Sequence, residues 1–337
     1  MPGARAPEGS RPNLWVLLAA AAWLGGVEPG GLALAGEQDQ TVTTDHPGAA
    51  AAAAVLGVDD LVSFWDFQQP TGEPRKARGR HQGALVDGDT DSPVTRAEGG
   101  LFGPWSGHFR QGQWLRLPRE QLGALDIHGP DAEVTVVTWL RREAPSYWQA
   151  IAGVWDETHR KRQYMLFLNA RTRTDHHTME REPCQNLVHG HISSVGGPTP
   201  GRDFCVTYAS GDTAVGFDRW QMLALTYDGR EIRVYLDGQL DAHQRFNPFP
   251  YDEGIFDGGD DGAEFTVGAN HVAGTENNNR FGGWIAGVAV WDRCLTADEM
   301  AALAAATLPP EDEAAEAAEP WPSESQDGEP DPPAGVN

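Results

Sequence analysis

The sequence predicts an all-β protein built as a two-sheet antiparallel sandwich of the jelly-roll type. Short segments rich in β-branched and aromatic residues alternate with turns rich in Gly, Asp and Pro. The clearest pair lies at residues 219–240, where an apolar-rich segment precedes Asp228-Gly229 and alternating apolar and polar residues follow it. An Asp-Gly pair tolerates the positive φ of a tight hairpin turn, and the alternation indicates one buried face per strand. The content of 40 Gly and 24 Pro in 337 residues also suits a fold with many turns.

Ten strands and one helix are expected in order along the chain. The strands span residues 61–68, 113–118, 133–142, 148–155, 163–169, 204–208, 220–227, 232–236, 264–268 and 283–291. Thr296 and Glu299 then form a capping box that begins a helix. Met300, Leu303 and Ala304 recur on one face of that helix, which we expect to pack on the sandwich.

The first 35 residues resemble a secretory signal peptide. An apolar core at residues 14–24 is too short for a stable membrane span, and residues 33–35 (Ala-Leu-Ala) fit the small-x-small cleavage rule. The mature chain is therefore expected to begin near Gly36. It is expected to be secreted, periplasmic or extracellular, with no stable membrane insertion after signal cleavage. An uncleaved N-terminal anchor is the alternative.

The remaining chain divides into a linker, one domain and a tail. Residues 36–57 are rich in Ala, Thr and Gly and are interpreted as a linker. Residues 58–307 contain the predicted strands and helix. Residues 308–337 hold nine carboxylates, no Lys or Arg and many Pro, so they are predicted to be a disordered acidic tail.

The charge balance limits the classes of partner. The net charge of −24 disfavours nucleic acid, anionic membranes and polyanionic sugars, because binding to them needs clustered Lys and Arg. An acidic surface instead suits solubility or cations that prefer oxygen ligands, such as Ca²⁺.

The chain has three cysteines, and export would permit a disulfide between two of them. Cys184 and Cys205 flank a turn-rich excursion and are the candidate pair. Cys294 is interpreted as a small core residue near the last strand.

An ordered set of motifs resembles the LamG-like (laminin G-like) domains of the concanavalin A-like lectin/glucanase superfamily. Trp220, Tyr227-Asp228-Gly229 and Leu236-Asp237-Gly238 follow the order of the family hairpin. Residues 265–268 and 281–291 resemble the strands that close the family sandwich. Further similarity in residues 61–67, 99–103 and 292–296 extends the resemblance to about residues 60–306. The resemblance implies a concanavalin A-like jelly roll with one short C-terminal helix.

Two features depart from, or add to, a minimal LamG-like domain. An insertion at about residues 170–218 carries four of the eleven histidines, and loops on a rigid scaffold often hold specificity. The resemblance also implies Ca²⁺ at the sandwich rim, for which Asp257, Asp260 and Asp261 are the candidate ligands. An acidic loop at residues 87–98 is a second candidate, although it lacks the Gly of a calcium loop and is interpreted first as a solvated loop.

Candidate ligand-binding residues are aromatic or histidine side chains near predicted loops. His189 and His191 would point to the same face of a strand, as metal ligands or acid/base groups must. Exposed Trp and Tyr rings stack on sugars, although Trp also packs in β cores. The candidates are Tyr147, Trp148, Trp155, His189, His191 and Tyr251.

These observations predict a non-enzymatic protein that binds a carbohydrate or another cell-surface ligand, with Ca²⁺ as a candidate cofactor. A glycoside hydrolase or polysaccharide lyase that uses the histidines of the insertion is one alternative. A purely structural or adhesion domain is another. No serine hydrolase, zinc protease or phosphate-loop motif occurs in the sequence.

Overall fold

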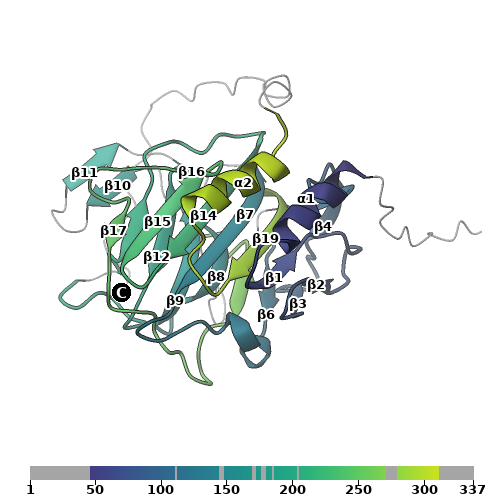
Figure 1. The fold of residues 1–337 in the computed structure, drawn as a ribbon. Helices are drawn as coiled ribbons and strands as arrows, with labels where there is room; N and C mark the ends of the chain where they lie inside the picture. The colour runs from purple at the N-terminus through teal and green to yellow at the C-terminus, as the bar shows by residue number, and fades with distance from the viewer. Residues whose placement is uncertain are drawn as a thin grey trace, which may run out of the picture. The chain divides into compact units, whose positions relative to one another are not determined.

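The computed structural model describes residues 46–110, 112–143, 148–168, 172–175, 180–183, 186–202, 205–270 and 279–310. Most described strands belong to two antiparallel sheets that pack face to face, with two helices outside them (Figure 1). The predicted jelly-roll sandwich is therefore confirmed. The predicted signal peptide and acidic tail lie outside the described residues.

The first sheet contains nine strands among the described residues. Its path is β16 (Gln239–Leu240), β15 (Glu231–Leu236), β14 (Trp220–Tyr227), β7 (Val134–Arg142), β19 (Gly283–Trp291), β5 (Trp105–Phe109) and β4 (Thr95–Glu98). In addition, β1 (Leu61–Trp65) pairs with β19, and β17 (Phe249–Pro250) pairs with β15.

The second sheet contains eight strands in the described part of the chain. Its path is β13 (Tyr208–Ser210), β12 (Val188–Ile192), β9 (Lys161–Leu168), β8 (Gln149–Asp156), β18 (Phe265–Val267), β6 (Leu115–Leu117), β3 (Ala84–Asp87) and β2 (Arg75–Lys76). The predicted insertion supplies β12 and β13, so it extends this sheet at one edge. It also contains the hairpin of β10 (Thr172–Asp175) and β11 (Glu180–Pro183).

The main hydrophobic core lies between the two sheets. Strand alternation directs one face of each sheet inward, as the buried side chains Leu166, Leu225 and Val290 illustrate. Trp65 stacks on Phe265 across this core, with ring centroids 5.2 Å apart. Two short 3₁₀ helices, η1 (Arg119–Gln121) and η2 (Gly123–Leu125), follow β6.

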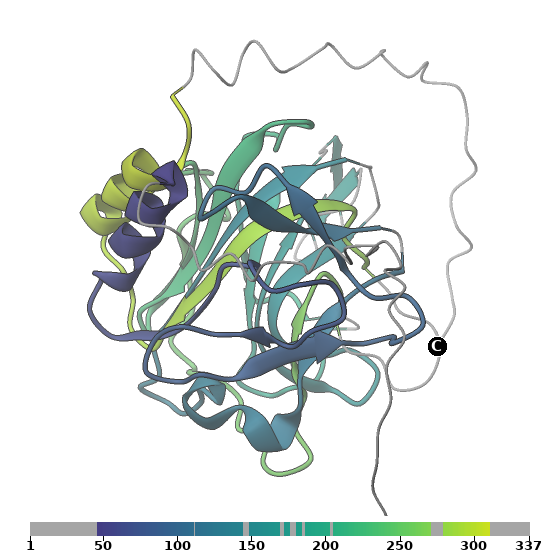
Figure 2. The same cartoon turned by 90° about the vertical axis from the view of Figure 1, so that its right-hand side faces the viewer.

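A second core lies between the first sheet and the helices α1 (Pro47–Leu56) and α2 (Ala297–Thr307). The two helices pack side by side on the outer face of the sheet (Figure 2). Met300 and Leu303 are buried there, and Trp139 Nε1 donates to Thr307 Oγ1 (2.7 Å). The capping box of Thr296 and Glu299 is present, which confirms the predicted helix start.

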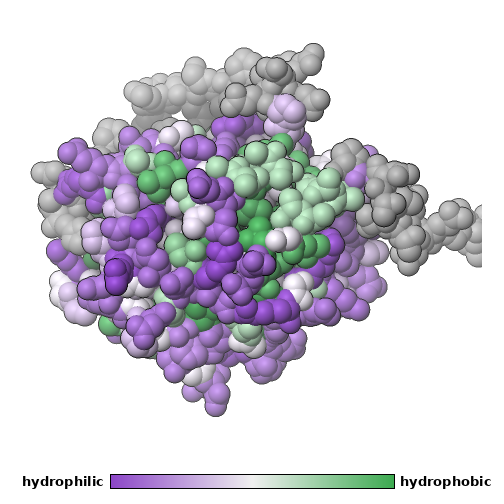
Figure 3. Space-filling model, in the orientation of Figure 1, coloured by the Kyte–Doolittle hydropathy of each residue, from purple (hydrophilic) through white to green (hydrophobic). Residues whose placement is uncertain are grey.

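The helix α1 takes up residues 47–56 of the stretch interpreted as a linker, whose residues 36–45 lie outside the described residues. Six consecutive alanines form most of α1, and Ala has the highest intrinsic helix propensity. Pro47 stands at the first turn, and the His46 side chain accepts a hydrogen bond from the Gly48 backbone N–H (3.0 Å). The apolar surface over both helices is visible in Figure 3. In the described residues, no helix combines the length and the apolar character that crossing a bilayer requires.

Candidate functional site

Four of the predicted ligand-binding residues meet on the outer face of the second sheet. A Cβ added to Gly190 would contact Leu225 and Val234 of the core, so His189 and His191 on either side of it point to the opposite face. The predicted common face of the two histidines is therefore confirmed. Their ring centroids lie 5.9 Å apart. Trp148 lies 5.2 Å from His189, and Trp155 lies 5.5 Å from His191.

This cluster is packed rather than open. Trp155 and His189 are each 1% exposed, and His191 is 8% exposed. Phe167 and Tyr208 complete the ring contacts around the histidines. Stacking on a sugar ring needs an exposed aromatic face, so this cluster is better described as a small buried core than as a stacking platform.

The cysteine prediction falls partly outside the described residues. Cys205 is a free thiol in the structure, and its Sγ lies 3.4 Å from Thr207 Oγ1. Burial raises the pKa of this thiol, so it is a poor nucleophile. The structure therefore contains no disulfide at Cys205. Its predicted partner Cys184 lies outside the described residues, as does the predicted ligand-binding residue Tyr147.

The acidic loop with Asp257, Asp260 and Asp261 does not form a coordination shell for Ca²⁺. Asp257 Oδ1 accepts the backbone N–H of Gly259 (2.9 Å), and Asp260 and Asp261 are exposed. No group of three or more His, Cys, Asp or Glu side chains suited to a metal ion occurs within the described ranges. The residues present therefore do not fit the predicted calcium site.

An arginine side chain contacts each of the two acidic loops. Arg119 Nε donates to the Gly259 carbonyl (2.9 Å), and its Nη atoms donate to both carboxylate oxygens of Asp126 (2.7 Å each). In the loop at residues 87–98, the buried Asp87 pairs with the buried Arg75 (2.6 Å). A guanidinium group therefore lies beside each acidic loop, and its positive charge weakens the attraction of the loop for a cation.

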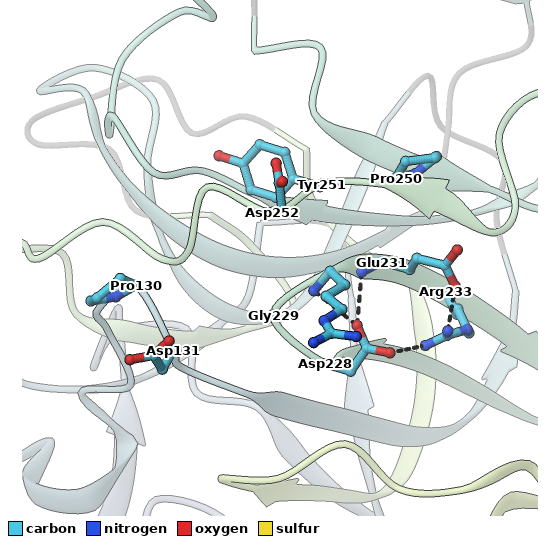
Figure 4. Close-up of a pocket in the computed structure, with 10 residues that line it drawn as sticks. Pro130, Asp131, Asp228, Gly229, Glu231, Arg233, Pro250, Tyr251 and Asp252 are labelled. Carbon is cyan, nitrogen blue, oxygen red and sulfur yellow. Dashed lines mark hydrogen bonds and ion pairs between the residues drawn. The ribbon is translucent and has the colours of Figure 1, made fainter.

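An open hollow lies instead at one end of the sandwich, beyond the turn between β14 and β15 (Figure 4). Its volume is about 730 Å³, within the range of small-molecule sites. We call this hollow the Asp228 pocket. Three segments of the chain form its wall. The lining residues are Pro130, Asp131, Asp228, Gly229, Arg230, Glu231, Arg233, Pro250, Tyr251 and Asp252.

The carboxylate of Asp228 organises one wall of the pocket. Its Oδ1 accepts the backbone N–H groups of Arg230 (2.9 Å) and Glu231 (2.7 Å), which fixes the turn. Its Oδ2 accepts from Arg233 Nη1 (2.8 Å), and Arg233 also pairs with Glu231. Burial alone would raise the pKa of Asp228, but these hydrogen bonds outweigh it and hold the pKa below its usual value. Gly229 supplies the positive φ (+79°) of the turn.

Hydrogen bonds hold the second wall, which includes Tyr251, against the wall formed by the Asp228 turn. The backbone N–H of Tyr251 donates to the Arg230 carbonyl (2.7 Å), and the Gly254 N–H donates to the Tyr227 hydroxyl (3.1 Å). The Tyr251 hydroxyl accepts the Ser194 N–H (2.7 Å), and burial raises its pKa to about 12. This hydroxyl therefore stays protonated at neutral pH. The pocket is formed in advance of any ligand.

Charged groups at the mouth of the pocket remain available. Asp131, Arg230 and Asp252 are exposed. None of the three makes an ion pair with another residue that the structure describes. The pocket thus offers two carboxylate acceptors and one guanidinium donor above a floor whose charged groups are paired with one another.

The sequence located only Tyr251 among the pocket residues. The Asp228-Gly229 turn was a strong signal, but of a hairpin rather than of a site. Asp131 and Asp252 lie in loops that carry no motif. The proximity of Asp131 and Asp252 depends on the β-bridge between Gly129 and Ile255, which joins two loops that are distant in the sequence.

Comparisons with known proteins agree with this architecture. A family model described as the concanavalin A-like lectin/glucanases superfamily matches residues 109–301. No match was found among curated proteins.

Several solved structures share part of the fold at low sequence identity. Domain 4 of AbnA, an extracellular arabinanase from Geobacillus stearothermophilus solved with arabinotriose, is 16% identical with a TM-score of 0.48, over 73% of this chain and 98% of that domain. Trypanosoma rangeli sialidase is 14% identical with a TM-score of 0.46, over 74% of this chain and 33% of the sialidase. A structure of botulinum neurotoxin type C is 8% identical with a TM-score of 0.45, over 74% and 52% of the two chains.

Proposed function

Because the chain belongs to the concanavalin A-like lectin/glucanases superfamily, we propose that it binds carbohydrate and that the Asp228 pocket is its binding site. The observation that carries the proposal is the pocket itself, which is open, polar and held in shape by hydrogen bonds between its walls. Sugars present many hydroxyl groups, and these donate to carboxylates and accept from guanidinium groups. A site formed in advance loses less entropy on binding.

The choice of this pocket over the outer face of the second sheet rests on exposure. Trp155 and His189 on that face are almost fully buried, whereas Asp131, Arg230 and Asp252 are exposed. The pocket lies on loops at the end of a rigid sandwich, where binding sites commonly occur. The role proposed here is binding without catalysis.

A glycan array followed by titration calorimetry tests the proposal. Arg230→Gln removes a charged donor from the pocket, and we expect it to weaken saccharide binding by about tenfold, as the loss of one charge-assisted hydrogen bond does. Arg202→Gln is the matched control, because Arg202 is also exposed and lies outside the pocket lining. Equal affinities for the two variants would place the site elsewhere.

We also propose that the protein is exported. The apolar core at residues 14–24 and the Ala-Leu-Ala sequence at residues 33–35 support this. Sequencing of the mature N-terminus checks it, with Gly36 as the expected first residue. A mature protein that begins at Met1 or Pro2 would contradict cleavage.

A further inference from the structure

The charge distribution of the Asp228 pocket indicates which class of saccharide it accepts. Its lining holds four carboxylates, from Asp131, Asp228, Glu231 and Asp252, and two guanidinium groups, from Arg230 and Arg233. The lining therefore has a formal charge of −2, from four negative and two positive groups. The whole chain adds a negative field, with a net charge of −24.

Half of the excess negative charge of the lining lies at the mouth of the pocket, where Asp131, Asp252 and Arg230 leave a formal charge of −1 that a ligand would meet. Arg233 is committed to Asp228 (2.8 Å) and to Glu231, so the charged groups of the floor are paired with one another and leave a formal charge of −1. Asp131 and Asp252 lie on two separate segments and form no ion pair with other described residues. Figure 4 shows them on different walls, away from the paired Asp228 and Arg233.

We propose that the pocket selects saccharides that carry a protonated amine, such as oligomers of glucosamine, over neutral and acidic saccharides. This inference rests on the carbohydrate-binding function proposed above. An ammonium group gains attraction from Asp131 and Asp252, while Arg230 donates to the ring hydroxyls of the same sugar. A uronic acid or sialic acid would place its carboxylate against the two free aspartates, and like charges disfavour that arrangement. A neutral sugar gains hydrogen bonds but no net charge attraction.

Calorimetry with a matched pair of ligands tests the selection. A glucosamine tetramer and its fully N-acetylated form differ chiefly in whether each nitrogen is charged. At about pH 6 and low ionic strength, with the amines protonated, we expect the amino form to bind about ten times more tightly. Because salt screens exposed charges, this preference should fall to about twofold near 1 M salt.

Isosteric variants connect the preference to the two aspartates. Asp131→Asn and Asp252→Asn each keep the side-chain shape, and each should weaken binding of the amino tetramer by about fivefold, with little effect on the acetylated form. Asp91→Asn is the matched control, because Asp91 is also exposed and lies outside the lining. Circular dichroism and the melting temperature confirm that each variant folds.

Each other outcome overturns the selection in a distinguishable way. Equal or tighter binding of the acetylated tetramer or of a uronate oligomer, still sensitive to Arg230→Gln, would refute the charge selection and leave carbohydrate binding in place. Equal binding of spermidine, which has amines and no sugar, would show a cation site rather than a saccharide site. Binding of no saccharide of any charge would refute the proposed function itself.

Discussion

The turn at Asp228 offers a direct test of how the pocket is held in shape. Oδ1 of Asp228 accepts two backbone N–H groups, and Oδ2 accepts from Arg233. Asp228→Ala removes all three bonds, whereas Asp228→Asn keeps an Oδ1 for the backbone and loses only the ion pair. The two substitutions therefore separate the contribution of the turn from that of the charge.

The side chains of Asp228 and Arg233 are 29% and 23% exposed, so each bond is partly screened by solvent. At about 1 kcal/mol for each hydrogen bond, Asp228→Ala should lower the free energy of unfolding by about 3 kcal/mol and Asp228→Asn by about 1 kcal/mol. Urea unfolding at pH 7, followed by tryptophan fluorescence, measures both values.

The direction in which this stability changes with pH follows from the pKa shift of Asp228. The pKa of Asp228 is lower in the folded protein than its ordinary value of 3.8, so the charge contributes stability above that value and loses it as the pH falls through the folded pKa. The difference between the native protein and Asp228→Asn should therefore shrink as the pH falls below about 4. Equal stabilities of the Asn and Ala variants would refute this reasoning. A stability difference between the native protein and Asp228→Asn that does not change with pH would also refute it.

Three further outcomes are expected. Glu299→Gln should destabilise the protein by about 1 kcal/mol at neutral pH, because the hydrogen bond from Arg293 lowers the pKa of Glu299 to about 2 from an ordinary value of 4.5. Acid urea titrations should show this difference fading as the pH falls from about 4.5 towards about 2. Trp139→Phe should cost about 2 kcal/mol in urea unfolding, since it removes the donor to Thr307 Oγ1 and leaves a small void. Calcium or a chelator should leave the melting temperature unchanged, because Arg119 already bonds the loop at residues 257–262; a shift of several degrees would restore the predicted calcium site.

The parts of the fold that were predictable depend on local signals. The hairpin of β14 and β15 follows from alternation around Asp228-Gly229, and α2 follows from the capping box at Thr296. The helix α1 was missed because its alanine run has no polar face to mark a period. Its partner α2 comes at the C-terminal end of the domain in the sequence, and only the folded sandwich brings the two helices together.

The candidate site was harder to predict because it depends on long-range contacts. Alternation correctly put His189 and His191 on one face, but it could not show that the face is buried. The acidic loop at residues 257–262 has the composition of a calcium site, while the cation beside it comes from Arg119, far away in the sequence. The pocket walls at Asp131, Asp228 and Asp252 become neighbours only when β7, β14, β15 and β17 have assembled in the first sheet and Gly129 has bridged to Ile255.

A crystal structure of the protein grown with the glucosamine tetramer tests the central claim most directly. We expect ordered sugar density in the Asp228 pocket, with the amine near Asp131 or Asp252 and hydroxyl groups within reach of Arg230. Sugar bound instead on the outer face of the second sheet beside Trp148, with the pocket empty, would contradict it.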